Sequence, residues 1–138
     1  MSDIFTRRRR SEIMARIKGR GNLSTEQKFA SMLRKAVVTG WRRHFLVLGI
    51  RPDFVFRASR TIVFVDGCFW HGCKACRAGR LPTGNLAFWR DKIGGNRRRD
   101  RAQTAKLRQA GWTVVRIWEH ELARPGARLE RLLMELAR

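Results

Sequence analysis

The pattern of hydrophobic and polar positions predicts helices that alternate with short strands. The first apolar stripe has the i, i+3, i+4, i+7 spacing of a helix and consists of Phe29, Met32, Leu33 and Ala36. Ser24 followed by Gln27 forms a capping-box pattern directly before this stripe. We therefore expect a helix over about residues 24–37.

Four apolar runs are typical of β-strands. The run over 41–48 is irregular, whereas those over 53–56 and 61–65 are rich in β-forming residues and are joined by a short link, which predicts an antiparallel pair. Because the run over 61–65 is apolar throughout, we expect it to be covered on both faces. The run over 112–118 follows a helical segment, which favours a right-handed βαβ crossover from 61–65.

Two further segments carry helical spacing. The first begins with a stripe at Leu86, Trp89 and Ile93. It is expected to continue from about 96 to 110, with Gly111 as its C-terminal stop. Gly126 precedes the second segment, which is the last helix. Its core stripe consists of Leu129, Leu132, Leu133 and Leu136.

The amino-acid composition indicates what kind of partner this α/β protein binds. The 31 Lys and Arg residues against 11 Asp and Glu give a formal net charge of +20, which makes a polyanion the expected partner. The basic residues are spread along the chain among Trp and Phe, so nucleic acid is favoured over a membrane surface. No segment resembles a signal peptide or a membrane span, so we expect a cytoplasmic, nucleoid-associated protein.

The N-terminal segment over 1–22 is strongly basic, and the single folded domain is expected over 23–138. The segment has too few apolar residues to fold alone, but it can lie along a DNA backbone with Ile13 and Met14 toward a groove. The alternative is a disordered basic tail that adds only nonspecific affinity.

Cys68, Cys73 and Cys76 are crowded into one loop, which favours thiolate ligands of a metal over a disulfide framework. Three thiolates are three ligands of a tetrahedral zinc site, and either His71 or His120 can supply the fourth. A site with four protein ligands has no open position, so it would be structural.

Two carboxylates are candidates for a different metal. Asp53 begins one strand and Asp66 ends the neighbouring one, so the pair is expected to meet at one edge of the sheet. A hard cation such as Mg²⁺ binds one or two carboxylates and keeps waters for a phosphate substrate. The alternative for Asp53, which follows Pro52, is an ordinary turn residue.

Aromatic residues flank the cysteine loop: Phe69, Trp70, Phe88 and Trp89. Apolar wedges inserted between base steps can open a duplex, but aromatic pairs at such spacing are also typical of a core. The sequence favours a core position for Trp89 and leaves Phe69 and Trp70 open.

Four blocks resemble, in order, those of the very short patch repair (Vsr) endonuclease family: RPDFVF, VFVDGCFWHGC, FWRDKIGGNRRRDR and GWTVVRIWEHEL. The resemblance runs from about Ser11 to Leu122. It implies a restriction endonuclease-like fold of the PD-(D/E)XK type, with a mixed central sheet flanked by helices, a structural zinc site and a basic N-terminal arm. It also implies an activity, the nicking of one strand beside the thymine of a T:G mismatch left by deamination of 5-methylcytosine.

The resemblance also implies roles for individual residues. Asp53 matches a metal-binding aspartate, His71 a catalytic histidine, and Glu26 the acidic residue that supports this histidine. If His71 is catalytic, zinc is expected on a set that includes the distant His120. The full set is Cys68, Cys73, Cys76 and His120.

DNA contacts follow from the same resemblance. The aromatics expected beside the mismatch are Phe69, Trp70 and Trp89, and the arm residues expected on the DNA are Met14, Arg16, Lys18 and Arg20. The chain departs from the family pattern at Val65 and Asp66, where threonine and histidine are frequent. Val65 offers only its main-chain oxygen to Mg²⁺, and Asp66 is either a second metal ligand or a charge that tunes His71.

The expectation is a monomeric, Mg²⁺-dependent endonuclease that acts on double-stranded DNA containing a T:G mismatch, with a mismatch-repair protein as a candidate partner. Asp53 with a second oxygen ligand would hold the metal, and His71 would move a proton. The alternatives are a restriction-type nuclease of the same fold that cuts matched DNA, and a noncatalytic zinc-braced DNA-binding module.

Overall fold

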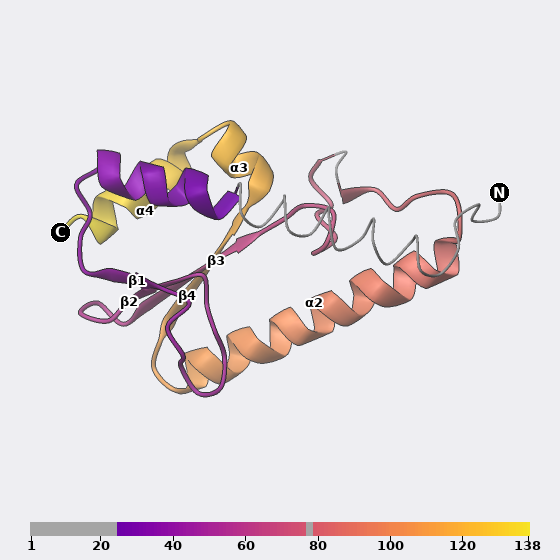
Figure 1. Ribbon diagram of the computed structural model, residues 1–138, viewed down its shortest axis with the longest axis horizontal. Helices are drawn as coiled ribbons and strands as arrows, with labels where there is room; N and C mark the ends of the chain where they lie inside the picture. The colour runs from indigo at the N-terminus through magenta and orange to yellow at the C-terminus, as the bar shows by residue number, and fades with distance from the viewer. Residues whose placement is uncertain (1–24, 77–78) are drawn as a thin grey trace.

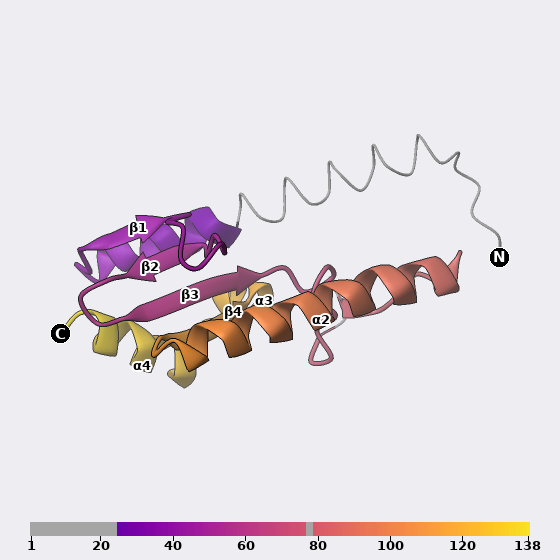
Figure 2. The ribbon, with the colours of Figure 1, turned by 90° about the horizontal axis from the view of Figure 1, so that it is seen from below.

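A four-stranded mixed sheet with helices on both faces forms the framework of the computed structural model (Figures 1 and 2). The structure describes residues 25–76 and 79–138. The predicted arm over 1–22 lies outside the described residues, and so do its DNA-binding candidates. These are Met14, Arg16, Lys18 and Arg20.

The sheet has the order β1-β2-β3-β4. Its strands are β1 (Trp41–Arg43), β2 (Phe54–Phe56), β3 (Thr61–Asp66) and β4 (Thr113–Trp118). β2 pairs antiparallel with both β1 and β3, whereas β4 runs parallel to β3. The predicted antiparallel pair and the parallel pairing after a helix are therefore confirmed.

The run predicted as one irregular strand over 41–48 is strand only at Trp41–Arg43. His44 takes a left-handed conformation with φ 55°, so the chain leaves the strand at that residue. Val47 and Ile50 then form an isolated antiparallel bridge around the turn. Extended pairing ends early because the backbone turns away from β2.

Every residue of β3 is buried, as predicted for a strand covered on both faces. On one face lie the helix over 25–35, α3 (Glu119–Ala123) and α4 (Ala127–Leu136), which Figure 1 shows together above the sheet. Between these helices and the sheet lies a hydrophobic core. Every second residue of the strands points into it, and the helices contribute further side chains. Its buried members include Phe29, Leu33, Phe54, Phe56, Val63, Val65, Ile117, Leu122 and Leu129. The predicted α4 stripe packs on this core, with Leu132, Leu133 and Leu136 partly buried beside the buried Leu129.

The long helix α2 (Leu86–Gln109) covers the other face. It includes both the predicted stripe at Leu86, Trp89 and Ile93 and the predicted continuation over 96–110 in one helix, and it extends beyond the sheet to the cysteine loop (Figure 2). Gly111, with φ 94°, follows its C-terminus, and its amide donates to the Arg108 carbonyl at 3.0 Å, which confirms the predicted stop. Within the described residues, no helix has the length and apolar character needed to cross a membrane.

The core between the sheet and the helix over 25–35 depends on Phe54, which is fully buried, with its ring centroid 4.9 Å from Phe29 and 5.6 Å from Trp41. Phe54→Ala is expected to lower the free energy of unfolding by about 3–5 kcal/mol, because the transfer free energy is lost and a cavity remains. Urea denaturation measures this loss. Met134→Ala, at an exposed position of α4, is the control and should change stability by less than about 0.5 kcal/mol. Similar values for both variants would contradict this account of the core.

Candidate active site

Potential ligands and proton carriers gather where β3 ends and the cysteine loop begins. The described residues form three groups there, with the ligand atoms of each group within 4.8 Å of one another. The groups are Glu26, His44 and Asp53; Asp66, His71 and Asp100; and Cys68, Cys73, Cys76 and His120. The first group lies on the side of the helix over 25–35, and the second includes Asp100 from α2.

Asp53 is fixed to the end of β3 through a main-chain contact. The Val65 N–H donates to Asp53 Oδ2 at 2.7 Å. In a strand, the N–H and C=O of one residue point to the same side, so the Val65 carbonyl is directed toward the same side as Asp53. Asp53 and the main-chain oxygen of Val65 therefore lie on the same side of β3, and their role as two oxygen ligands stays a prediction.

The electrostatic environment of Asp53 favours the binding of a proton or a cation. The pKa of Asp53 is raised from 3.8 to about 8, first by burial and then by the hydrogen bond and charge of neighbouring Glu26, against the lowering effect of the Val65 amide. Asp66 adds a smaller repulsion. A bound cation would favour the ionised carboxylates instead.

Glu26 does not contact His71, so the predicted support of His71 by Glu26 is corrected. Arg43 Nη2 donates to Glu26 Oε2 at 2.6 Å, and His44 Nε2 lies 3.0 Å from the same oxygen. Arg43 and His44 follow one another at the end of β1, beside the helix that carries Glu26. The carboxylate therefore belongs with Asp53 and His44.

His71 is paired with Asp100 instead. Its Nδ1 contacts Asp100 Oδ2 and lies 3.7 Å from Asp66 Oδ1. Burial alone would raise the pKa of Asp100, but its hydrogen bond and charge interaction with His71, with the charge of Arg116, hold the pKa below its ordinary value. The sequence did not predict a role for Asp100, because a carboxylate in an Arg-rich helix is typical of an ordinary surface charge.

Asp66 is held by an arginine, not by the ligand group of Asp53. Arg116 Nη1 donates to both carboxylate oxygens, at 3.0 and 3.1 Å, and its guanidinium lies 4.1 Å from the Phe64 ring centroid. Burial raises the pKa of Asp66, while His71 and Arg116 oppose that rise. The described ligand groups do not place Asp66 with Asp53, and the geometry favours the other prediction for Asp66, a charge beside His71.

The third group has tetrahedral dimensions. Cys68 Sγ and Cys73 Sγ lie 3.4 and 3.6 Å from His120 Nδ1, and Cys76 Sγ lies 3.8 Å from Cys73 Sγ. In a tetrahedral zinc site, bond lengths of about 2.0–2.3 Å separate ligand atoms by about 3.5–3.8 Å. The four side chains therefore fit one metal ion. Without a metal, burial raises the pKa of Cys68 to about 12, which opposes thiolate formation.

Aromatic rings form a continuous cluster between the loop and α2. Phe69 lies 5.1 Å from Trp70 and 5.4 Å from Trp89, measured between ring centroids. Trp70 is only 7% exposed, and its indole nitrogen has no hydrogen-bond partner among the described residues. Phe69 and Trp89 are half-buried. In this conformation Phe69 and Trp89 are the more accessible of the three predicted DNA contacts, and Trp70 packs beneath them.

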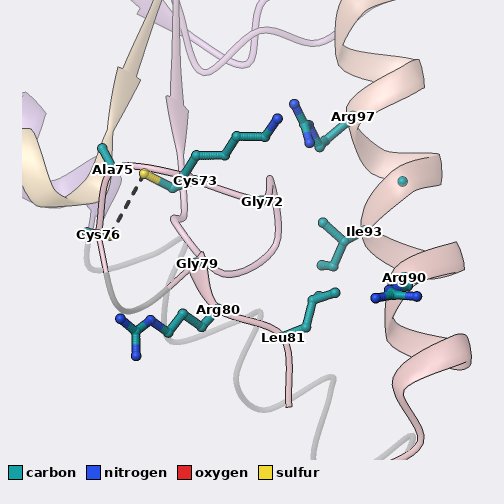
Figure 3. A pocket seen from close by; sticks show the side chains of 12 residues that line it. Gly72, Cys73, Ala75, Cys76, Gly79, Arg80, Leu81, Arg90, Ile93 and Arg97 are labelled. Atoms are coloured by element: carbon teal, nitrogen blue, oxygen red, sulfur yellow. Dashed lines mark hydrogen bonds between the residues drawn. The ribbon is translucent and has the colours of Figure 1, made fainter. Parts of the chain in front are cut away.

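A basic pocket of about 620 Å³ separates the cysteine loop from α2 (Figure 3). Arg80 borders it from the loop side, and Arg90 and Arg97 extend from α2. Lys74 also lines it, and the described residues around it include no carboxylate. Such a pocket suits an anionic group.

The mixed sheet flanked by helices, with carboxylates at the end of its central strands, is consistent with the restriction endonuclease-like class of fold. Comparison with known proteins identifies the family within this class. The family model described as DNA mismatch endonuclease Vsr matches residues 2–77, and the chain belongs to that family.

Several relatives match most of the chain. The chain is 37% identical over 123 residues to the DNA mismatch endonuclease Vsr of Escherichia coli, which covers 86% of this chain and 74% of the relative. It is 38% identical to the type II nicking enzyme V.XorIIP of Xanthomonas oryzae, over 96% of this chain and 95% of the relative. The type II nicking enzyme V.NmeAIP of Neisseria meningitidis is 34% identical, over 99% of this chain and 97% of the relative. These relatives are DNA endonucleases.

The raised pKa of Asp53 predicts a pH-dependent stability. Because the folded protein keeps a proton that the unfolded chain has lost, the free energy of unfolding should fall as pH rises from about 4 to about 8. Asp53→Asn cannot ionise, so its stability relative to the original protein should increase over the same interval. Urea denaturation between pH 5 and 8, without added divalent ions, measures the difference. Parallel pH profiles for the two proteins would contradict the assignment.

Proposed function

We propose that this protein is a mismatch-directed DNA endonuclease, which nicks one strand beside the thymine of a T:G pair and thereby starts very short patch repair. The observation that carries the proposal is the placement of the Asp53–Glu26 carboxylates and the His71–Asp100 pair at the end of β3. A carboxylate pair suited to a cation and a histidine suited to proton transfer are the groups that phosphodiester hydrolysis requires.

The residues around Asp53 fit a divalent cation such as Mg²⁺, since buried like-charged carboxylates favour one and the main-chain oxygen of Val65 is directed to the same side. A bound cation would polarise the phosphate and lower the pKa of a water molecule. The chain's own part is to fix the ligands, because the Val65 amide holds Asp53 and Arg43 holds Glu26.

His71 would move the proton. Asp100 engages Nδ1, which fixes the ring orientation and leaves Nε2 as the nitrogen that exchanges a proton with the reacting group. Asp66 adds negative charge near the same Nδ1 while Arg116 limits it. Asp100 thus takes the supporting role that the sequence had assigned to Glu26.

A structural zinc ion on the Cys3His group would hold the loop in place. The group joins the loop after β3 to α3, which carries His120. With four protein ligands the site has no open position, so its contribution is to position His71 and the aromatic cluster.

DNA would be held by cations and aromatic rings together. The basic pocket between Arg80, Arg90 and Arg97 suits a backbone phosphate. Phe69 and Trp89 are accessible enough to contact bases beside the mismatch, and Trp70 would support them. The basic arm over 1–22 would add contacts, and we infer a monomer that works at cytoplasmic, nucleoid-associated DNA with a mismatch-repair protein as partner.

The specific alternative is a nuclease that cuts matched DNA, because several relatives are named type II nicking enzymes. Duplexes with a T:G or a C:G pair at one position, each strand labelled separately, distinguish the two functions. We expect nicking of the T-containing strand only, dependent on Mg²⁺ and weaker at high salt. Equal cutting of both duplexes would establish the alternative.

Asp53→Ala tests whether the chain is catalytic at all. Nicking should fall about 100-fold or more, because the cation's charge stabilisation is worth several kcal/mol, while binding to the T:G duplex persists. Asp91→Ala removes an exposed carboxylate from α2 and is the matched control. Undiminished nicking by Asp53→Ala would remove Asp53 from the mechanism.

Cys73→Ser tests the zinc site. Loss of a thiolate ligand should release zinc and lower the melting temperature, because a structural metal contributes folding free energy. Metal analysis with thermal unfolding measures both, and Lys74→Ala, at the adjacent exposed position, is the control. A zinc-free original protein of equal stability would contradict the structural role.

A further inference from the structure

A histidine that the sequence did not single out lies in the carboxylate group at the end of β3. His44 Nε2 is 3.0 Å from Glu26 Oε2, and both belong to one group of potential ligands with Asp53. We propose that His44 is a direct ligand of the divalent ion in this site, together with Glu26 and Asp53. The proposal rests on the proposed function and specifies which ion the site prefers.

The distance between the two atoms is that of neighbouring ligands. In an octahedral ion with bonds of about 2.1 Å, adjacent ligand atoms lie about 3.0 Å apart. The three side chains come from three separate parts of the chain. Glu26 lies in the helix over 25–35, His44 directly follows β1, and Asp53 directly precedes β2. They converge from different directions, as ligands around one ion do.

The position of His44 also suits a ligand. Its side chain is 49% exposed, so an ion with its waters and a phosphate can reach it, whereas the Glu26 side chain is only 10% exposed. The left-handed backbone of His44 directs the chain out of β1 at this point. Its main-chain N–H donates to the Asp53 carbonyl at 3.3 Å, which ties the residue to Asp53.

The donor set has a chemical consequence. Mg²⁺ takes carboxylate, carbonyl and water oxygens, whereas an imidazole ligand favours first-row transition ions. A site of two carboxylates and one imidazole should therefore bind Mn²⁺ more tightly than Mg²⁺. Arg116 donates to both oxygens of Asp66, whereas the Arg43 contact with Glu26 is to Oε2, so Glu26 is the better placed of the two to share an ion with Asp53.

The competing role for His44 is that of a hydrogen-bond donor to Glu26, alongside Arg43. The two roles predict opposite effects of removing the imidazole. A ligand strengthens cation binding, so its loss weakens binding. A protonated donor repels a cation, so its loss leaves binding unchanged or makes it tighter.

The test is Mn²⁺ binding to the zinc-loaded protein, measured by calorimetry and by pulsed electron paramagnetic resonance. For His44→Ala we expect the Mn²⁺ dissociation constant to rise by at least about tenfold, since loss of even an outer partner of a ligand costs about 10–100-fold. The Mg²⁺ constant should change less. The nitrogen coupling of the bound Mn²⁺ should vanish in His44→Ala and persist in His71→Ala.

The chain has three histidines, so single substitutions assign the coupling completely. Unchanged or tighter Mn²⁺ binding in His44→Ala, or a coupling that disappears in His71→Ala instead, would overturn the proposal. His44→Asn provides a second variant, because Asn tolerates the left-handed backbone and is too short to place a nitrogen on the ion. Nicking is scored separately, so Mn²⁺ coordination by His44 without nicking would refute only the proposed function.

Discussion

The burial of β3 on both faces is the constraint on which the site depends. Successive residues of a strand point to opposite faces, so Val65 enters the core beneath the helix over 25–35 while Asp66 faces α2. Polar groups can collect only where the strand ends. Two carboxylate groups therefore lie close together but on different sides of one strand, and each is served by a different helix.

This separation gives the two groups different charge balances. Asp66 and Asp100 share Arg116 and His71, so their charges are compensated within the protein. Asp53 receives a main-chain N–H and has the Glu26 carboxylate beside it. Arg116 thus supplies counter-charge to Asp66 and Arg43 supplies it to Glu26, while burial and the neighbouring Glu26 raise the pKa of Asp53.

The sequence predicted β3 and α4 well because both carry strong apolar patterns, whereas α2 is marked by a short stripe at its start and by Gly111 after its end. The grouping of the three cysteines was also predictable from their spacing, whereas His120 as their fourth partner came from the resemblance to the family. The partners of His71 and Glu26 were not predictable from spacing, because Asp100 reaches His71 only through the course of α2. The sequence did not predict a role for His44, because its contact with Glu26 depends on where β1 ends.

The position of His71 depends on the loop's attachments at both ends. Cys68 and Cys73 meet His120 after β4, while Asn96 of α2 donates to the Trp70 carbonyl at 2.8 Å. Gly72 permits this close approach, because a Cβ there would lie 2.9 Å from Ile93 and its φ of 64° is left-handed. His71 is held between these attachments, so a change at the cysteines would reach His71 through the loop backbone before it reached the Asp53 group. The cysteine group and His71 therefore lie on one loop that is attached to α3 and α2, while the group of Glu26, His44 and Asp53 lies on the other side of β3.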